Sequence, residues 1–281
     1  MEPNNTPIDQ FQRIVRQPDD QIDLARAALL IAKGRNHSLD VERYIAELDF
    51  LGTTLRRRMA EDAGVMLRIG ALNQFLFQEH GFAPNLKDYY DPRNSFLNEV
   101  LDRKVGIPIS LSVLYIEVGR RIGLPLRGVS FPGHFLVKCK IDQGLIILDP
   151  FTGGASLSMQ DLQKRLRDAR GGEVSRAIVA SMLVAAEKKE ILARMLRNLK
   201  SVYVQREEVQ AALSVIEWLM VLSPDAASEI RDRGLLFQQM ECFRAALSDL
   251  ERYLKLQPGA DDADDIHAKV VELRQSTARL N

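Results

Sequence analysis

The chain has 281 residues, of which 46% are hydrophobic and 27% are charged, with 38 basic and 38 acidic side chains. This length and apolar content predict two domains, each with a core of its own. A net charge of zero argues against a global field that would draw the chain to nucleic acid or to an anionic membrane. The basic run Arg56-Arg57-Arg58 is too short to change that expectation.

The N-terminal sequence MEPNNTPIDQFQ has no charged segment followed by an apolar one, which is the pattern of a signal peptide. No apolar run approaches the roughly 20 residues that span a bilayer. We therefore predict a cytoplasmic protein that does not bind membranes. Cys139 and Cys242 lie among apolar neighbours and have no CxxC partner, so we expect two small buried residues and no disulfide or zinc site.

Residues 1–90 are predicted to form a helical N-terminal region. Apolar side chains recur at the spacing of an amphipathic helix in three stretches, 24–31, 41–51 and 67–76. The second stretch follows Ser38-Leu39-Asp40, which is typical of a capped helix start. Nothing in this region suggests chemistry.

Residues 91–185 are predicted to form an α+β core that packs with the N-terminal helices as one domain. The expected elements are one helix and three strands, over residues 111–122, 127–131, 134–141 and 145–149. Gly123 and Pro125 supply the helix stop. A helix followed by antiparallel strands is an α+β signal.

Residues 186–281 are predicted to be helical again and to contain a repeat. The phrases AALSVIEWLMVLSP and AALSDLERYLKLQP end at Pro224 and Pro258, 34 residues apart, which is the tetratricopeptide period. Lys200 stands where the second repeat has Gly234, so the first repeat is the less regular. We expect two repeats and a capping helix over 264–280. Such a tail either packs on the preceding domain or binds a partner protein.

The central segment carries a candidate catalytic order. In thiol-dependent hydrolases and acyltransferases the nucleophile opens a helix, whose dipole favours the thiolate, and a His from a neighbouring strand takes its proton. An Asp then holds that His in the useful tautomer. Here the stretch GIPISLS precedes the predicted helix, His134 lies in PGHF, and Asp149 lies in ILDPF.

These phrases resemble the transglutaminase-like superfamily of papain-type folds. In that superfamily GxC opens the helix, R-x-x-G-[IL]-P closes it, and a His strand and an Asp follow. The matching positions are Gly106, Arg120, Gly123-Leu124-Pro125, His134 and Asp149. Counting back from Gly123 places the Cys position on Pro108 and the Ala that follows it on Ser112, so the resemblance implies a site without its nucleophile.

More closely, residues 20 to 281 resemble the SirB-type bacterial proteins, which join a helical N-terminal region and a transglutaminase-like core to a tetratricopeptide tail. The phrases NSFLNEVLDRKVGIPISLS, PGHFLV and LDPFTGG carry this resemblance, together with AALLIAKGRNHSLDVERYIAELD upstream. The resemblance implies a regulatory role and no established reaction.

Several candidate residues keep more than one interpretation. Ser110 is the best substitute nucleophile, although two residues along a helix turn a side chain by about 200° from Pro108. The His134–Asp149 pair is expected to be a buried structural hydrogen bond, part of a ligand or peptide site, or a catalytic pair. Asn94 and Ser95, in the helix-start phrase DPRNS, are expected to border the cleft.

We therefore predict a non-catalytic regulatory protein that binds a protein or peptide through the remnant cleft, the tetratricopeptide tail, or both. Asn94, Ser95 and Pro108 are its candidate binding residues. The alternative is an amide hydrolase or acyltransferase that uses Ser110 with His134 and Asp149. The four His residues are scattered without metal-ligand spacing, and no glycine-rich phosphate loop is present, so we predict neither a metal nor a cofactor.

Overall fold

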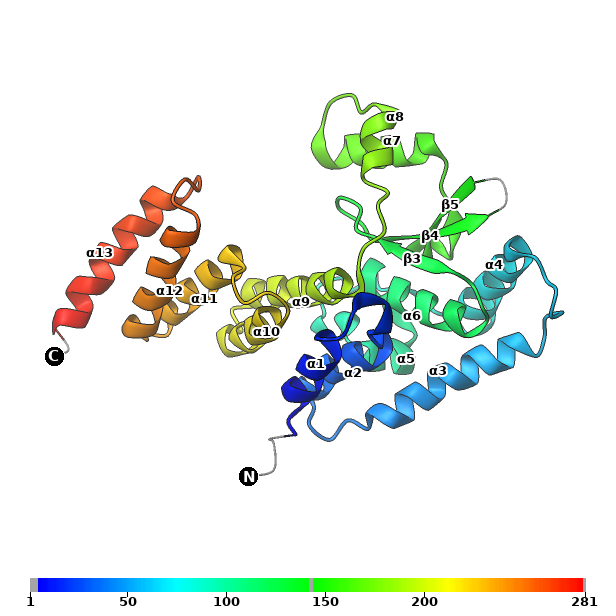
Figure 1. Ribbon diagram of the computed structural model, residues 1–281, viewed down its shortest axis with the longest axis horizontal. Helices are drawn as coiled ribbons and strands as arrows, with labels where there is room; N and C mark the ends of the chain where they lie inside the picture. Colours follow the sequence, from blue (N-terminus) through cyan, green and yellow to red (C-terminus); the bar gives the residue numbers. More distant parts are fainter. Residues whose placement is uncertain (1–4, 142–143, 280–281) are drawn as a thin grey trace. The chain divides into compact units, whose positions relative to one another are not determined.

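The computed structural model describes residues 5–141 and 144–279 (Figure 1). The chain divides into two compact units, one up to Met195 and one from Leu196 onward. The boundary lies inside helix α9 (Lys188–Gln205), whereas the sequence places the start of the repeat tail at residue 186. Each unit is described by itself.

The N-terminal region is helical, as the sequence predicts. Each of its first three α-helices begins where a side-chain oxygen of Thr6, Asp23 or Asp40 accepts a hydrogen bond from the backbone three residues later, the arrangement that favours a helix start. The elements are α1 (Pro7–Val15), η1 (Asp19–Gln21), α2 (Leu24–Arg35), α3 (Val41–Arg56), α4 (Val65–Asn73) and the π-helical turn η2 (Gln74–Glu79).

Helix α6 (Pro108–Arg121) is the central element of the first unit. Every side chain from Pro108 to Gly119 is buried, because its sequence is apolar around most of the helix circumference. It begins at Pro108, three residues before the predicted start, since proline suits the first helical position. The neighbouring elements are β1 (Ala83–Pro84), η3 (Pro92–Ser95), α5 (Leu97–Arg103) and β2 (Val105–Gly106), in which β1 and β2 pair in parallel.

A four-stranded antiparallel sheet in the order β3-β4-β5-β6 follows α6. Its strands are β3 (Leu126–Val129), β4 (Leu136–Ile141), β5 (Gly144–Asp149) and β6 (Ala155–Ser156). Figure 1 shows α6 on one side of the sheet and α7 (Met159–Arg170) and α8 (Arg176–Ser181) on the other. A buried apolar cluster joins α7 and α8 to the sheet through Leu136, Ile147, Leu162, Leu166 and Val179.

The second unit continues α9 with α10 (Val209–Leu222), α11 (Ala227–Gln239), α12 (Phe243–Leu256) and α13 (Ala263–Arg279). Its core includes Ile230, Ala246, Leu250, Tyr253 and Ile266. Gly234 allows α11 and α12 to approach closely, because a Cβ there would lie 2.8 Å from Leu250 Cδ2. Ala246 and Leu250, which lie in the second of the two repeat phrases, thus belong to this core.

Lys200, the residue that departs from the repeat pattern, is bound to acidic residues of α11. Its Nζ lies 2.5 Å from Glu229 Oε2 and 2.6 Å from Asp232 Oδ2. Arg197 Nε contacts the other oxygen of the buried Glu229 carboxylate at 2.9 Å. Ion pairs of Lys200 therefore join α9 to α11 at the position where the second repeat has Gly234.

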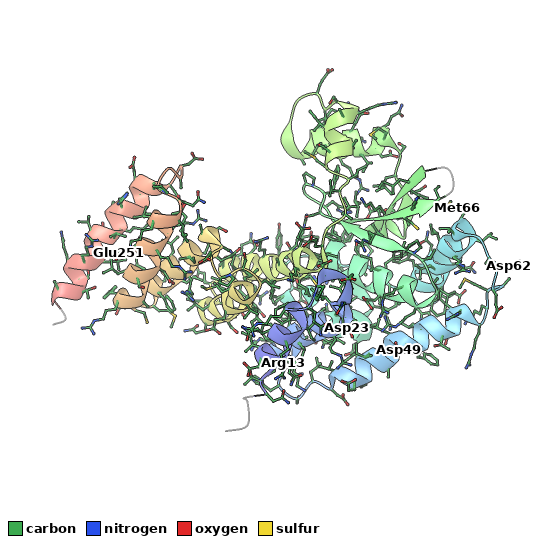
Figure 2. All side chains as sticks on the ribbon, viewed as in Figure 1. Arg13, Asp23, Asp49, Asp62, Met66 and Glu251 are labelled. Atoms are coloured by element: carbon green, nitrogen blue, oxygen red, sulfur yellow. The ribbon has the colours of Figure 1, made fainter. Side chains whose placement is uncertain are left out.

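The two cysteines differ in burial. Cys139 is buried on β4, as expected, whereas Cys242 is exposed, so the prediction was wrong there. Cys242 precedes α12 in the connection from α11, where Phe243 packs against the core and Met240 is exposed. Figure 2 draws the side chains, among them the exposed Asp49 on α3, Asp62 in the following loop, and Met66 on α4. None of the helices in the described ranges combines the length and apolar character that crossing a bilayer requires.

Replacing Lys200 by Met should destabilise the second unit by about 3 kcal/mol, because it removes one partner of a buried carboxylate. Arg197→Met is the matched control and should cost less, since 51% of the Arg197 side chain is exposed, against 13% for Lys200. Urea unfolding followed by the fluorescence of Trp218, which lies in α10, measures both. Equal effects of the two variants would contradict the assignment.

Gly154 joins the end of the sheet to α4 and α6. Its carbonyl accepts a hydrogen bond from Asn73 Nδ2 at 2.9 Å, and Asn73 Oδ1 accepts one from Tyr115 at 2.7 Å. A Cβ on Gly154 would lie 2.0 Å from Asn73 Oδ1. The loop after β5 is therefore held against the helices through a contact that only glycine permits.

Gly154→Ala should therefore lower the free energy of unfolding of the first unit by about 2–4 kcal/mol, from backbone strain and overpacking together. Gly153→Ala is the control, because Gly153 has the same left-handed backbone, with φ of 69° against 76°, and nothing within 4 Å of an added Cβ. It should cost only about 1–2 kcal/mol. Denaturation followed by circular dichroism compares the two variants. Identical losses in the free energy of unfolding would contradict the role assigned to the Gly154–Asn73 contact.

Candidate functional site

His134 lies in the bend that precedes β4, and not on the strand as the sequence analysis predicts. Pro132 and Gly133 form a turn in which Gly133 has φ of 68° and the His134 amide donates to Phe131 O at 3.1 Å. Because of this turn, strand β4 begins only at Leu136. His134 is therefore placed by a tight loop at one end of the sheet.

Asp149 ends β5, and the structure brings it to His134. Asp149 Oδ1 lies 2.9 Å from His134 Nε2 and also accepts a hydrogen bond from the Phe151 amide at 3.0 Å. Its second oxygen, Oδ2, lies 2.7 Å from Arg165 Nη2 on α7 in an ion pair. The Asp149 side chain is fully buried, so one carboxylate joins the β4 loop, the turn after β5, and α7.

Opposing effects act on the Asp149 carboxyl group. Burial alone would raise the pKa of Asp149, because it disfavours the charged form. The hydrogen bond and charge of His134, and then the contact with Arg165, outweigh burial and lower the pKa of Asp149 below its usual value. Asp149 is therefore a carboxylate at neutral pH, fit to orient His134 or to hold it in place.

Arg194 fixes the loop that carries His134. Its Nη2 donates to the carbonyl of His134 at 2.8 Å and to that of Phe131 at 3.2 Å, while Nη1 donates to Ser130 Oγ at 2.6 Å. Its guanidinium also lies over the Phe135 ring, 5.6 Å from the centroid. One side chain of α9 thus binds the whole turn from Ser130 to Phe135.

Pro108 occupies the first residue of α6, where the sequence analysis places the nucleophile position. Ser110 is fully buried, and its Oγ donates to Asn94 O at 2.6 Å and accepts from the Ile107 amide at 3.1 Å. Among the hydrogen bonds of the described residues, Ser110 makes none with His134. Ser112, at the position of the family's Ala, donates to Phe135 O at 3.4 Å and so ties α6 to the start of β4.

Asn94 and Ser95 form the end of the short helix η3, which Asp91 caps. Asn94 is fully buried; its Nδ2 donates to Asp88 O at 2.7 Å, and its Oδ1 accepts from Asn85 at 2.9 Å. Ser95 and Pro108 are buried too. A direct binding role for Asn94, Ser95 and Pro108 stays a prediction, and the observed contacts of Asn94 are internal ones.

An aromatic surface, made of Tyr89, Tyr90 and Phe151, adjoins His134. The ring centroids of His134 and Phe151 are 5.7 Å apart, those of Phe151 and Tyr89 6.4 Å, and those of Tyr89 and Tyr90 5.3 Å. Tyr89 is 41% exposed and Tyr90 58%. The polar pair is therefore bordered by large apolar rings that reach solvent.

The structure adds three residues that the sequence analysis did not select: Arg165, Arg194 and Tyr89. None belongs to a recognisable motif, and each reaches the site from an element other than those that carry His134 and Asp149. Within residues 5–141 and 144–279, no three His, Cys, Asp or Glu side chains cluster as metal ligands would. Burial raises the pKa of the Cys139 thiol, which makes it a poor nucleophile.

Comparison with known proteins gives two matches to family models. The model of the transglutaminase-like superfamily matches residues 42–197, and a tetratricopeptide repeat model matches residues 199–270. Both agree with the resemblance drawn from the central motifs and the 34-residue repeat. No solved structure was found to match the chain.

The relatives include bacterial proteins that align with this chain over about nine tenths of both lengths. A UPF0162 protein of Xylella fastidiosa is 41% identical over 257 residues, which cover 91% of each chain. One from Vibrio cholerae is 31% identical over 252 residues, covering 89% of this chain and 92% of the relative. F-box only protein 21 of Mus musculus is 33% identical over 141 residues, covering 47% of this chain and 21% of that protein.

Asp149→Asn should lower the free energy of unfolding of the first unit by about 2–3 kcal/mol at neutral pH, the worth of hydrogen bonds to a charged group. In the wild type the lowered pKa of Asp149 means that this contribution is complete above about pH 4 and is lost as the pH falls through the folded-state pKa. The variant should lack that pH-dependent step.

Urea unfolding from about pH 7 to about pH 3, followed by amide hydrogen exchange in β4 and β5, measures this difference. Asp62→Asn, at an exposed loop position, is the control and should follow the wild type. A constant difference between wild type and Asp149→Asn at every pH would contradict the assignment.

Proposed function

We propose that this chain, which belongs to the transglutaminase-like superfamily, acts by binding a protein partner and not by acyl transfer. The observation that carries this proposal is Pro108 at the first residue of α6, in a chain that keeps the His134–Asp149 pair. In this proposal His134 and Asp149 are the polar partners of a former catalytic site, and Pro108 replaces the residue that would attack a substrate. We include a regulatory role and a cytoplasmic location in this proposal.

The other nucleophiles of the chain do not favour catalysis. Cys139 is buried on β4 with a raised pKa, and Cys242 belongs to the other unit. Ser110 donates its hydroxyl proton to the Asn94 carbonyl, whereas a nucleophilic serine needs its base within hydrogen-bond reach. These contacts weigh against the hydrolase or acyltransferase alternative.

The His134–Asp149 pair has a structural use that requires no reaction. Together with Arg165 and Arg194 it fixes the loop before β4 and the turn after β5, which present His134 and Phe151 at the surface. A rigid, preorganised surface loses little conformational entropy on binding. The pair therefore supports a binding surface as readily as a catalytic one.

The aromatic surface is the part of this region that best suits a protein partner. Tyrosine is enriched in the centres of protein interfaces, where its ring packs and its hydroxyl still finds a hydrogen-bond partner. Leu86, which is 74% exposed and lies in the same loop as Tyr89 and Tyr90, extends the apolar area. Tetratricopeptide repeats also commonly bind proteins, so the tail offers a second route to a partner.

The catalytic part of the proposal is tested with electrophilic probes for serine and cysteine and with an amine-incorporation assay. Wild type and His134→Ala should show the same low labelling and no turnover. Ser110→Ala should behave like both. Labelling or turnover that the wild type shows and His134→Ala loses would overturn the proposal, because only a working base produces that difference.

The binding part is tested with a photo-crosslinking amino acid placed at Tyr90 in the full-length protein. It should join the chain to a defined partner protein, and Tyr89→Ala should reduce the yield several-fold by removing one side of the aromatic surface. The control places the same group at Leu67, an exposed apolar residue of α4. Equal crosslinking from both positions, or none from Tyr90, would count against a partner at this surface.

A further inference from the structure

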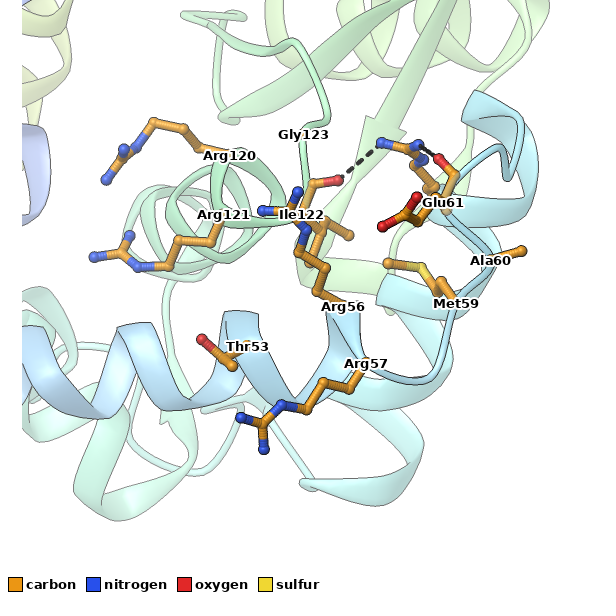
Figure 3. A pocket seen from close by; sticks show the side chains of 11 residues that line it. Thr53, Arg56, Arg57, Met59, Ala60, Glu61, Arg120, Arg121, Ile122 and Gly123 are labelled. Carbon is orange, nitrogen blue, oxygen red and sulfur yellow. Dashed lines mark hydrogen bonds between the residues drawn. The ribbon is translucent and has the colours of Figure 1, made fainter.

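A pocket of about 760 Å³ lies in the first unit, away from the His134 region, where the C-terminal ends of α3 and α6 meet the start of α4. Five arginines line it: Arg56, Arg57, Arg68, Arg120 and Arg121. Figure 3 shows their side chains, with Arg56 and Arg57 coming from the end of α3 and Arg120 and Arg121 from the end of α6. We call this site the arginine pocket.

Two of these arginines contact carboxylates that are not part of the pocket lining. Arg121 Nε contacts Asp49 at 2.7 Å, and its Nη1 contacts Glu117 Oε2 at 2.8 Å. Arg120 Nη2 contacts the same Glu117 oxygen at 3.1 Å. The buried Glu117 carboxylate is thus shared by two guanidinium groups, and Asp49 adds a second carboxylate to Arg121.

The stem of Arg121 lies against α3 because residue 52 is glycine. A Cβ on Gly52 would lie 2.4 Å from Arg121 Cβ, so any larger residue would push the two helices apart. This close approach brings the basic end of α3 next to that of α6. The sequence separates Arg56 and Arg57 from Arg120 and Arg121 by some sixty residues, and the packing joins them.

Arg68 adds a charge that no carboxylate offsets among its observed contacts. Its Nε, Nη1 and Nη2 donate to the carbonyls of Ala63, Ile122 and Glu61, at 2.7, 3.1 and 2.8 Å. Figure 3 marks two of these bonds with dashed lines. Carbonyl oxygens orient a guanidinium group but leave its positive charge, so Arg68 gives the pocket wall a rigid cation.

The charge around the pocket is unbalanced. Five arginines line it, against Glu61 in the lining and the carboxylates of Asp49 and Glu117 that contact Arg120 and Arg121. Among the described residues, Arg56 and Arg57 appear in no ion pair, whereas their neighbour Arg58 pairs with Glu79 and lies over the Phe75 ring at 5.1 Å. Two arginines of this basic run, Arg56 and Arg57, therefore line the pocket, whereas Arg58 is paired outside it.

We propose that the arginine pocket binds a small anion that carries two or more phosphate groups. Guanidinium groups stay charged and bind phosphate oxygens in pairs, so several of them around one space suit a ligand with several phosphoryl oxygens. The pocket volume falls within the roughly 300–1,000 Å³ of small-molecule sites. Its mostly polar wall suits a charged ligand better than an apolar one.

Pyrophosphate binding by the full-length protein, measured by titration calorimetry, tests this proposal. The wild type should bind saturably, with affinity that falls as salt is added. Arg56→Gln with Arg57→Gln should weaken binding at least about tenfold through the lost charge-assisted hydrogen bonds. Arg58→Gln is the matched control from the same basic run and should bind like the wild type.

Thermal melting of each variant separates ligand binding from a purely structural role. Arginines near helix C-termini also interact favourably with the helix dipole. Loss of that effect would lower the melting temperature of the variant equally with and without pyrophosphate, so the rise that the ligand causes would not change. The proposal predicts that pyrophosphate raises the melting temperature of the wild type and of Arg58→Gln, and not of the double variant. Absence of saturable binding, equal loss in Arg58→Gln, or binding only to an oligonucleotide or to anionic vesicles would overturn it.

Discussion

The candidate site of the first unit depends on the contacts of one buried carboxylate, that of Asp149. It has no exposed surface, and its contacts reach the loop before β4 through His134, the turn after β5 through the Phe151 amide, and α7 through Arg165. A buried charge is stable only when it is paired and hydrogen-bonded. Because all of its partners come from separate elements, the charge requires those elements to lie together, whether or not a reaction follows.

Helix α6 connects this site to the rest of the unit. Its N-terminal half carries Pro108 and Ser112, and Ser112 is tied to the start of β4. Its C-terminal end carries Arg120 and Arg121, which line the arginine pocket. One buried helix therefore carries at one end Pro108, which we propose stands in place of the nucleophile, and at the other end part of the arginine pocket. Both proposals depend on the same fold, but on separate residues.

The fold and the pairing of His134 with Asp149 could be predicted because they follow from local patterns. Gly123 and Pro125 mark the end of α6, alternating apolar residues mark the strands, and the order His then Asp places both at the same end of an antiparallel sheet. The strand start at Leu136 was missed because the Pro132-Gly133 turn extends through His134. The exposure of Cys242 was missed because apolar sequence neighbours do not reveal which way one residue of a short connection points.

The sequence by itself determined α6, the strands β3 to β5, the helical character of the two ends of the chain, the repeat period and the proline at position 108, since each depends on residues close together in the chain. It did not predict α7, α8 or β6. The tertiary structure decided what binds Asp149 besides His134, where the Ser110 hydroxyl goes, and that two distant arginine pairs share one pocket. Those contacts join residues that lie in different elements of the chain. Only the packing of whole elements, such as α3 against α6 at Gly52, sets the distances between them.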